Sequence, residues 1–253
     1  MRDDSVRVSG TAVEGAVVLV TGAAGGIGRA LVEALRSAGA AEIIAADRGE
    51  VDWPSGVTPL ELDVTQPAAV ERAAARVADR VDILINNAGF NGNLRLFSDD
   101  FVSVARREVE VNYFGLVHMA AAFAPEMRRR GRGTIVNLLT FLGHVNLPLM
   151  ASYCASKAAA HSITQALRAE LGAAGVRVLG VYPTVVDTPM SRNVQAPKLA
   201  PAQLALDLID AIRAGAEDVY PGTAAGAYRE LLADPKQVER RMALRLPGAD
   251  PSR

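Results

Sequence analysis

Near its N-terminus the chain contains a strand, a glycine-rich turn and a helix in direct succession, and this unit limits the possible fold more than any other. The apolar run Ala16-Val17-Val18-Leu19-Val20 leads directly into Thr21-Gly22-Ala23-Ala24-Gly25-Gly26-Ile27-Gly28. Leu31, Val32 and Leu35 then recur at helical spacing. Because glycines allow close backbone approach and a helix N-terminus attracts anions, the unit predicts a phosphate-binding turn.

Short apolar runs and helical segments continue to alternate along the whole chain. Further strands are expected at 42–46, 58–62, 81–85, 134–139, 176–181 and 218–220. Strands that alternate with helices imply right-handed crossovers and a parallel sheet that is covered on both faces. The predicted fold is therefore α/β, a single-domain Rossmann-type doubly wound parallel sheet of about seven strands.

The length and composition favour one large domain. The chain has 253 residues, of which half are hydrophobic and 22 are glycine. We place a flexible leader at 1–13, a single domain at 14–253, and a substrate loop near 187–200. The charged tail from about Asp234 is expected to be only partly packed.

The charge and cysteine content exclude several classes of partner. The formal net charge is −1, so no global field draws nucleic acid or a membrane. The basic cluster 128–132 suits the C-terminal end of a helix. Cys154 is the only cysteine, which excludes an intrachain disulfide and a multi-cysteine zinc site, and we expect no metal. The polar N-terminus and the lack of a long apolar run favour a cytoplasmic location.

An acidic residue marks the end of the second strand. Asp47 stands nineteen residues after Gly28. A carboxylate at this position can accept hydrogen bonds from both ribose hydroxyls of an adenosine, and it repels a 2′-phosphate. Arg48 follows and could bind such a phosphate. We therefore expect NAD, with an NADP-dependent carbonyl reductase that uses Arg48 as the alternative.

Tyr153 and Lys157 stand four residues apart in a segment of helical composition, so both side chains leave the same face. A nearby ammonium favours ionisation of a phenol. Lowering the pKa of a tyrosine from about 10 to about 7 requires roughly 4 kcal/mol, more than one screened lysine supplies. A second positive charge is needed, and an oxidised nicotinamide ring would provide it.

Several motifs occur in one order along the chain. They are Thr21-Gly22-x-x-x-Gly26-x-Gly28, Asn86-Asn87-Ala88-Gly89, Asn112, the hydroxyl of Thr140, and Tyr153-x-x-x-Lys157. In this order they resemble the short-chain dehydrogenase/reductase family, in particular its compact single-domain members. The resemblance covers nearly everything from Ala16 to Tyr220.

The resemblance implies catalytic roles for four residues. Tyr153 would be the general acid/base, and Lys157 would hold the nicotinamide ribose and lower the pKa of Tyr153. Asn112 would anchor a water that links Lys157 to solvent. Thr140 stands where the family usually has serine, and it would orient the substrate oxygen.

The resemblance also implies a cofactor site and a family-like assembly. The family's usual Pro-Gly is Pro183-Thr184 here, which puts the cofactor geometry in doubt. A homo-oligomer, tetramer or dimer, is implied by the resemblance alone. The implied cofactor-binding residues are Gly22, Gly26, Ile27, Gly28, Asp47, Asp63, Val64, Asn87, Ala88, Gly89, Tyr153, Lys157, Val186 and Thr188.

The segment 141–150 should border the substrate pocket, and it is mostly apolar, with no arginine fork for an anion. We therefore expect a hydrophobic secondary alcohol or ketone as substrate. The pocket residues are expected to be Phe141, His144, Met150 and Met190, with Phe90 and Leu94 nearby, although His144 could instead be a solvated loop residue. The rival hypothesis is a dinucleotide-sensing binding protein without catalysis.

Overall fold

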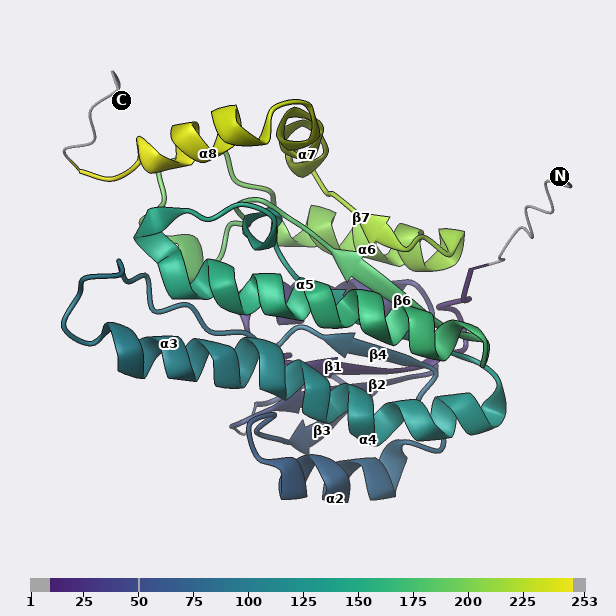
Figure 1. Cartoon of the computed structure of the whole chain (residues 1–253). Coiled ribbons are helices and arrows are strands. Elements are labelled where there is room, and N and C mark those ends of the chain that lie inside the picture. The colour runs from purple at the N-terminus through teal and green to yellow at the C-terminus, as the bar shows by residue number, and fades with distance from the viewer. Residues whose placement is uncertain (1–9, 50, 248–253) are drawn as a thin grey trace, which may run out of the picture.

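The central element is a parallel sheet of seven strands, in the order β3-β2-β1-β4-β5-β6-β7 (Figure 1). The structure is a computed structural model and describes residues 10–49 and 51–247. Every neighbouring pair of strands is parallel, which confirms the predicted fold class. The strands are β1 (Val17–Thr21), β2 (Glu42–Asp47), β3 (Val57–Glu61), β4 (Ile83–Asn86), β5 (Gly133–Leu138), β6 (Val176–Val181) and β7 (Asp218–Val219).

The inner strands are buried on both faces, because successive side chains point to opposite sides of the sheet. In β1, Val18 and Val20 belong to one core cluster and Leu19 to the other. β3 has three exposed residues and lies at an edge, which explains why Pro59 is tolerated there.

Helices cover both faces of the sheet (Figure 1). α1 (Gly26–Ser37) and α6 (Pro201–Ala214) pack against the cluster that contains Val18 and Val20. On the other face lie α2 (Pro67–Val77), α4 (Gly115–Arg130) and α5 (Ala151–Gly172). The apolar positions of these helices recur at helical spacing, as in Leu31, Val32 and Leu35 of α1.

The segment before β5 forms one long rod of three consecutive helical segments. α3 (Phe101–Val109) continues through a π-helical turn, η1 (Glu110–Phe114), into α4. The middle residue of this turn is Asn112, which is buried. A π-turn inserts one extra residue without breaking the rod, and such turns often occur at functional sites.

The stretch after Asp234 is helical as far as Ala243. α7 (Ala224–Ala233) is followed by α8 (Pro235–Ala243), which begins with the carboxylate of Asp234 accepting a hydrogen bond from the Gln237 N–H at 2.9 Å. Val238 is 1% exposed and packs with Leu231 and Phe141. Apart from Val238 and the half-buried Met242, the residues of α8 are exposed, which agrees with the expected partial packing as far as Ala243.

Residues 10–13, which we expected to be part of a flexible leader, are anchored. The Thr11 N–H donates to the Ile212 carbonyl at 3.0 Å, and the Thr11 and Thr134 hydroxyls lie 2.7 Å apart. Val13 is 1% exposed. The rest of the expected leader, 1–9, lies outside the described residues. In the described part of the chain, no helix combines the length and the apolarity that a membrane span requires.

Candidate active site

A cavity of about 620 Å³ opens at the carboxyl ends of the strands. β1 and β4 are neighbours in the sheet, and the strand order reverses between them. Sheets of this class bind ligands at such a switch point, outside the carboxyl ends of the strands. The cavity brings together Gly22, Gly26, Ile27, Asp47, Val64, Asn87, Ala88, Gly89, Thr140, Met150, Tyr153, Lys157, Val186, Thr188 and Met190, all of them predicted site residues.

The glycine turn closes against its neighbours so tightly that two of its positions exclude a side chain. Gly22 has φ +63°, and a Cβ atom there would lie 2.8 Å from the Cα of Ala88. A Cβ on Gly28 would lie 2.2 Å from the Gly22 carbonyl oxygen, so only glycine allows α1 to pack this closely against the turn. Gly28 itself does not line the cavity. Since the N-cap of α1 is Gly25, no side chain caps the first turn, and the site fits an anionic pyrophosphate.

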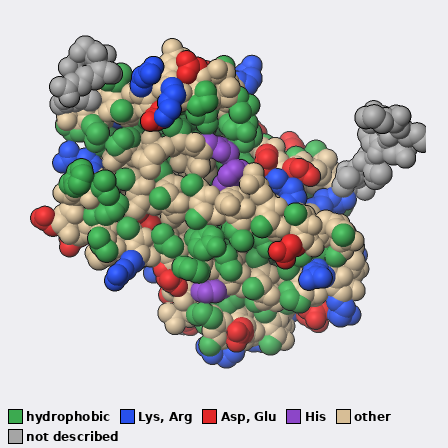
Figure 2. Space-filling model, in the orientation of Figure 1, with side chains coloured by type: hydrophobic (Ala, Val, Ile, Leu, Met, Phe, Trp, Pro, Cys, Tyr) green, Lys and Arg blue, Asp and Glu red, His purple; other side chains and the backbone are tan. Residues whose placement is uncertain are grey.

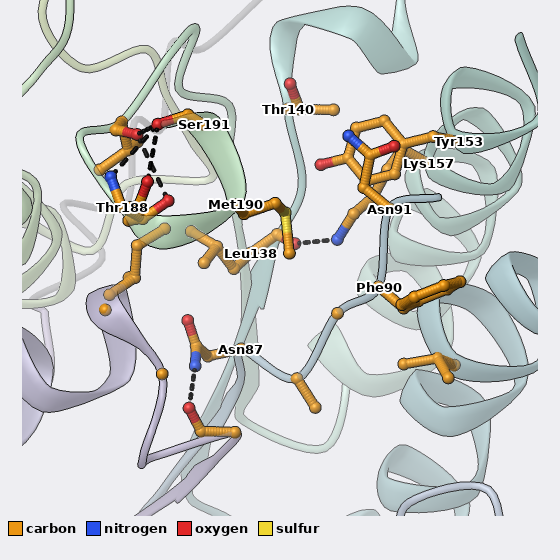
Figure 3. Close-up of a pocket in the computed structure, with 18 of the residues that line it drawn as sticks. Asn87, Phe90, Asn91, Leu138, Thr140, Tyr153, Lys157, Thr188, Met190 and Ser191 are labelled. Atoms are coloured by element: carbon orange, nitrogen blue, oxygen red, sulfur yellow. Dashed lines mark hydrogen bonds between the residues drawn. The ribbon is translucent and has the colours of Figure 1, made fainter. Parts of the chain in front are cut away.

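Asn87 braces this turn from the end of β4. Its amide nitrogen donates to the carbonyls of Thr21 and Gly22, both at 2.9 Å. Figure 3 draws one of these two bonds. The N–H groups of Asn87 and Ala88 in turn donate to the Thr21 hydroxyl at 3.0 and 3.1 Å. The Asn-Ala-Gly segment therefore fixes the shape of the glycine turn.

The carboxylate of Asp47 is held by backbone N–H groups at the end of β2. One oxygen accepts from Ala24 and the other from Arg48, both at 2.8 Å. Arg48 is exposed and lines the cavity. Arg29, which the sequence analysis did not consider, donates from Nε to the Ala24 carbonyl at 3.0 Å, so a second guanidinium lies near this corner.

Tyr153 and Lys157 both project from the first two turns of α5 into the cavity (Figure 3). Lys157 is 5% exposed, and its ammonium donates to the Leu138 carbonyl at 2.8 Å. Burial lowers the pKa of Lys157 to about 8. Burial also raises the pKa of Tyr153 above its ordinary value. Without a bound cofactor, the burial of Tyr153 therefore favours the protonated phenol.

Thr140 follows the last residues of β5 and lies on the same wall of the cavity as Tyr153, opposite Thr188 and Ser191 (Figure 3). Its hydroxyl donates to the Pro183 carbonyl at 3.2 Å and accepts from the Leu142 N–H at 3.3 Å. These two contacts fix the χ1 angle of Thr140 and hold its oxygen at the wall.

Asn112 uses its whole amide within the protein. Its oxygen accepts from the Phe90 N–H at 2.8 Å, and its nitrogen donates to the Phe90 carbonyl at 2.8 Å and the Ser156 hydroxyl at 2.9 Å. It does not line the main cavity but borders a second one of about 10 Å³, together with Lys157 and Asn86. That space is about enough for one water molecule.

Asp63 and Phe141 do not lie in the cavity wall, although both were predicted to be site residues. The Asp63 carboxylate accepts from the Thr65 N–H and hydroxyl at 2.9 and 2.8 Å, which makes a local turn, and the neighbouring residues Leu62 and Val64 line the cavity instead. Phe141 is 2% exposed and packs under α7 and α8, against residues such as Leu231.

His144 is neither a pocket residue nor a solvated loop residue, and both expectations are wrong. Its ring lies among Tyr182, Tyr220, Tyr228 and His161, with centroid distances from 4.6 to 5.9 Å. Burial lowers the pKa of His144 to about 4. The 3₁₀ turn η2 (Phe141–Gly143) directs the chain beneath α7, which no local pattern of the sequence could indicate.

The cavity also contains residues that the sequence analysis missed. Leu142 and Leu147 lie in the segment that was expected to border the pocket, so their apolar character was a usable signal. Arg107 had no such signal, and its guanidinium lies 4.1 Å above the Phe90 ring. The other missed lining residues include Asn91, Leu138, Ser191 and Val194.

A doubly wound sheet with a glycine-rich turn and a Tyr–Lys pair facing one cavity is typical of oxidoreductases of the Rossmann class. A model of the family described as short chain dehydrogenase matches residues 16–199. The chain belongs to this short-chain dehydrogenase/reductase family.

Three similar proteins illustrate the range of the family. A short chain dehydrogenase from Burkholderia cenocepacia J2315, solved in complex with NADP, has a TM-score of 0.87 and 41% identity and covers 92% of this chain and 99% of its own. One from Burkholderia phymatum, solved in complex with NAD, has a TM-score of 0.78 and 26% identity, covering 90% and 96%. Carbonyl reductase (NADPH) 2 of Sus scrofa is 37% identical over 190 residues, which are 72% of this chain and 77% of the pig protein.

Proposed function

We propose that the protein interconverts hydrophobic secondary alcohols and ketones with a nicotinamide dinucleotide, preferably NAD. The observation that carries this proposal is that Tyr153 and Lys157 face the same cavity as the glycine turn (Figure 3). The carbonyl reductase relative supports the reaction class. The intact pair also favours an enzyme over a dinucleotide-sensing binding protein, which would bind NAD without turnover.

In this proposal Tyr153 moves the proton. When bound, the nicotinamide ring exchanges a hydride with the substrate carbon, and its oxidised form adds positive charge to the site. The Tyr153 hydroxyl gives a proton to the carbonyl oxygen in reduction and takes it from the alcohol in oxidation. Because the chain by itself raises the pKa of this phenol, its ionisation depends on the charge that the bound cofactor brings.

Lys157 and Asn112 support this proton transfer. With a pKa of about 8, Lys157 is mostly protonated at neutral pH, and its ammonium can hold a ribose hydroxyl and favour the tyrosinate. The small cavity between Asn112 and Lys157 fits one water, which would pass the proton on toward solvent. Asn112 itself holds Phe90 and Ser156, so it positions the surrounding backbone.

Thr140 is expected to hold the substrate oxygen through its hydroxyl, whose single proton then turns from the Pro183 carbonyl, 3.2 Å away, to the substrate. Replacing Thr140 by serine keeps the oxygen and should retain most of the activity. Thr140→Ala removes the donor and should lower kcat/KM by about 10²-fold or more, as for other donors to a developing oxyanion. Steady-state kinetics of both variants test this role, and equal rates for the wild type and Thr140→Ala would refute it.

Asp47 is expected to set the cofactor preference. Its carboxylate accepts hydrogen bonds from the Ala24 and Arg48 N–H groups, and its negative charge repels a 2′-phosphate. Asp47→Ala should therefore shift the ratio of kcat/KM for NADH over NADPH by about tenfold or more toward NADPH, which is about 1.4 kcal/mol. Asp63→Ala is a matched control outside the cavity wall and should leave this ratio unchanged.

NADP is the second candidate cofactor. Arg48 lines the cavity, Arg29 lies near the same corner, and the Burkholderia cenocepacia relative was solved with NADP. If the wild type prefers NADPH, Arg48→Ala should lower kcat/KM for NADPH and leave kcat/KM for NADH unchanged. A wild type that prefers NADPH would reject the proposed NAD preference.

The apolar lining of the cavity supports a hydrophobic substrate. Leu142, Leu147, Met150 and Met190 all contribute to it. A spectrophotometric panel of secondary alcohols and ketones with both cofactors is the direct test. Activity confined to anionic, phosphorylated or CoA-linked compounds would reject the hydrophobic substrate, and Arg107 would then be the residue to change.

We also propose a cytoplasmic homo-oligomer. Apolar side chains gather on the face that carries α3 to α5 (Figure 2), and Phe97, Val102 and Phe114 are 96%, 63% and 42% exposed. Covering these side chains in an oligomer would remove apolar surface from water. Light scattering during size-exclusion chromatography tests the assembly, and cell fractionation tests the location.

A further inference from the structure

Asn91 places an amide at the wall of the same cavity as Tyr153 (Figure 3). It follows Phe90 in the loop between β4 and α3. Most of the wall around it is apolar, including Met150, which the Asn91 amide nitrogen contacts at 3.4 Å through the sulfur atom. An amide in such a wall is costly unless its hydrogen bonds are used.

The orientation of the amide is fixed by the backbone that follows. The Asn91 side-chain oxygen accepts from the Asn93 N–H at 2.9 Å, which forms an Asx-turn. Asn93 has φ +54°, in the left-handed region that such turns favour. Because the oxygen faces this N–H, the NH₂ group faces Met150 and the cavity.

The loop that carries Asn91 is held in place by residues of α3. The carboxylate of Glu108, which is 1% exposed, accepts from the Gly92 N–H at 2.8 Å and also from the Ser152 hydroxyl, next to Tyr153. A Cβ on Gly92 would lie 2.2 Å from a methyl carbon of Val104, so the loop packs directly on α3. The donor is therefore set in place relative to the helix that carries the catalytic tyrosine.

The Asn91 donor lacks a strong partner within the described structure. A thioether sulfur is a weak acceptor, and its contact with the NH₂ group is easily exchanged for one with oxygen. A substrate that brings an acceptor oxygen to this point would gain a hydrogen bond at little cost in side-chain ordering. A substrate with an apolar carbon there would gain none.

We propose that Asn91 is a specificity-determining residue that donates a hydrogen bond to a second oxygen of the substrate, distinct from the oxygen that exchanges its proton with Tyr153. The substrate class is then a hydrophobic ketone or secondary alcohol with an additional carbonyl-type acceptor near the reacting carbon. This inference rests on the proposed function and narrows its substrate.

The test compares three ketones of one carbon chain: the unsubstituted methyl ketone, the diketone, and the hydroxyketone with its hydroxyl in place of the second carbonyl. We expect Asn91→Leu to lower kcat/KM for the diketone, relative to that for the methyl ketone, by about tenfold. Comparing this ratio between the wild type and the variant cancels the intrinsic reactivity of the compounds.

Asn91→Asp separates recognition from a purely structural role. The carboxylate still accepts from the Asn93 N–H, so the turn is kept, but it presents an acceptor to the cavity in place of the donor. We expect the preference to reverse, with the hydroxyketone favoured over the diketone. Met150→Leu removes the sulfur and should leave the preference for the diketone intact.

Two results would overturn the inference in distinguishable ways. If the wild type reduces the ketones but both Asn91 variants leave the ratios unchanged, Asn91 does not recognise a second oxygen and the proposed function stands. If the wild type turns over none of the ketones with either cofactor, the proposed function fails and the inference fails with it.

Discussion

Replacing Tyr153 by phenylalanine is expected to lower kcat by about 10²–10⁴-fold, the usual contribution of a positioned general acid/base. The change removes one oxygen atom and keeps the ring, so the packing of α5 should be preserved. Cofactor affinity, measured by the quenching of protein fluorescence, should change little. Steady-state rates with saturating substrate, measured in both directions, give the fall in kcat.

The control for this change is Tyr113→Phe, which removes a phenol that does not line the cavity. It should keep wild-type rates. If Tyr153→Phe turned over substrate at the rate of this control, the assignment of the general acid/base would be wrong.

Replacing Gly28 by alanine is expected to abolish tight cofactor binding. The added Cβ would lie 2.2 Å from the Gly22 carbonyl oxygen and 2.7 Å from the Cα of Ala23, so the turn and the start of α1 must move apart. Overpacking of this kind costs about 1–3 kcal/mol of stability. The Kd for the cofactor should rise at least about tenfold, since pyrophosphate binding depends on close backbone approach.

Gly172→Ala provides the matched control for this prediction. Gly172 is the last residue of α5, and a Cβ there would have no heavy atom within 4 Å outside its own helix. Alanine should be neutral or slightly stabilising at this position. A Gly28→Ala variant with an unchanged melting temperature and cofactor Kd would contradict the geometry of the glycine turn.

The sheet was predictable from the sequence because its inner strands are buried on both faces. Each strand is therefore a short continuous apolar run, such as 16–20, and the order of these runs implies parallel strands with crossover helices. Asp47 was predicted to be a site residue for a related reason, since it ends β2, whereas the family resemblance implied Asn87 and Thr140.

The errors fall where placement depends on distant segments. Phe141 lies between the cavity residues Thr140 and Leu142, and His144 is two residues beyond Leu142. Phe141 packs instead with side chains of α7 and α8, and His144 with Tyr228 of α7. Arg107 reaches the cavity from α3, over the ring of Phe90, and Asn91 reaches it from the loop held by Glu108. Neither position is marked by a periodic pattern. Local spacing carries no information about such long-range contacts.

The most direct test of the central claim is the pH dependence of kcat in both directions, in the wild type and in Tyr153→Phe. Reduction needs the protonated phenol and oxidation needs the ionised one, so the oxidation rate should rise with pH. The reduction rate should fall only at a higher pH, because the reduced cofactor lacks the positive charge that favours ionisation of Tyr153. The residual rate of Tyr153→Phe should not show this ionisation. If the wild-type oxidation rate were flat between about pH 6 and 10, or if Tyr153→Phe kept its rise with pH, Tyr153 would not be the residue that moves the proton.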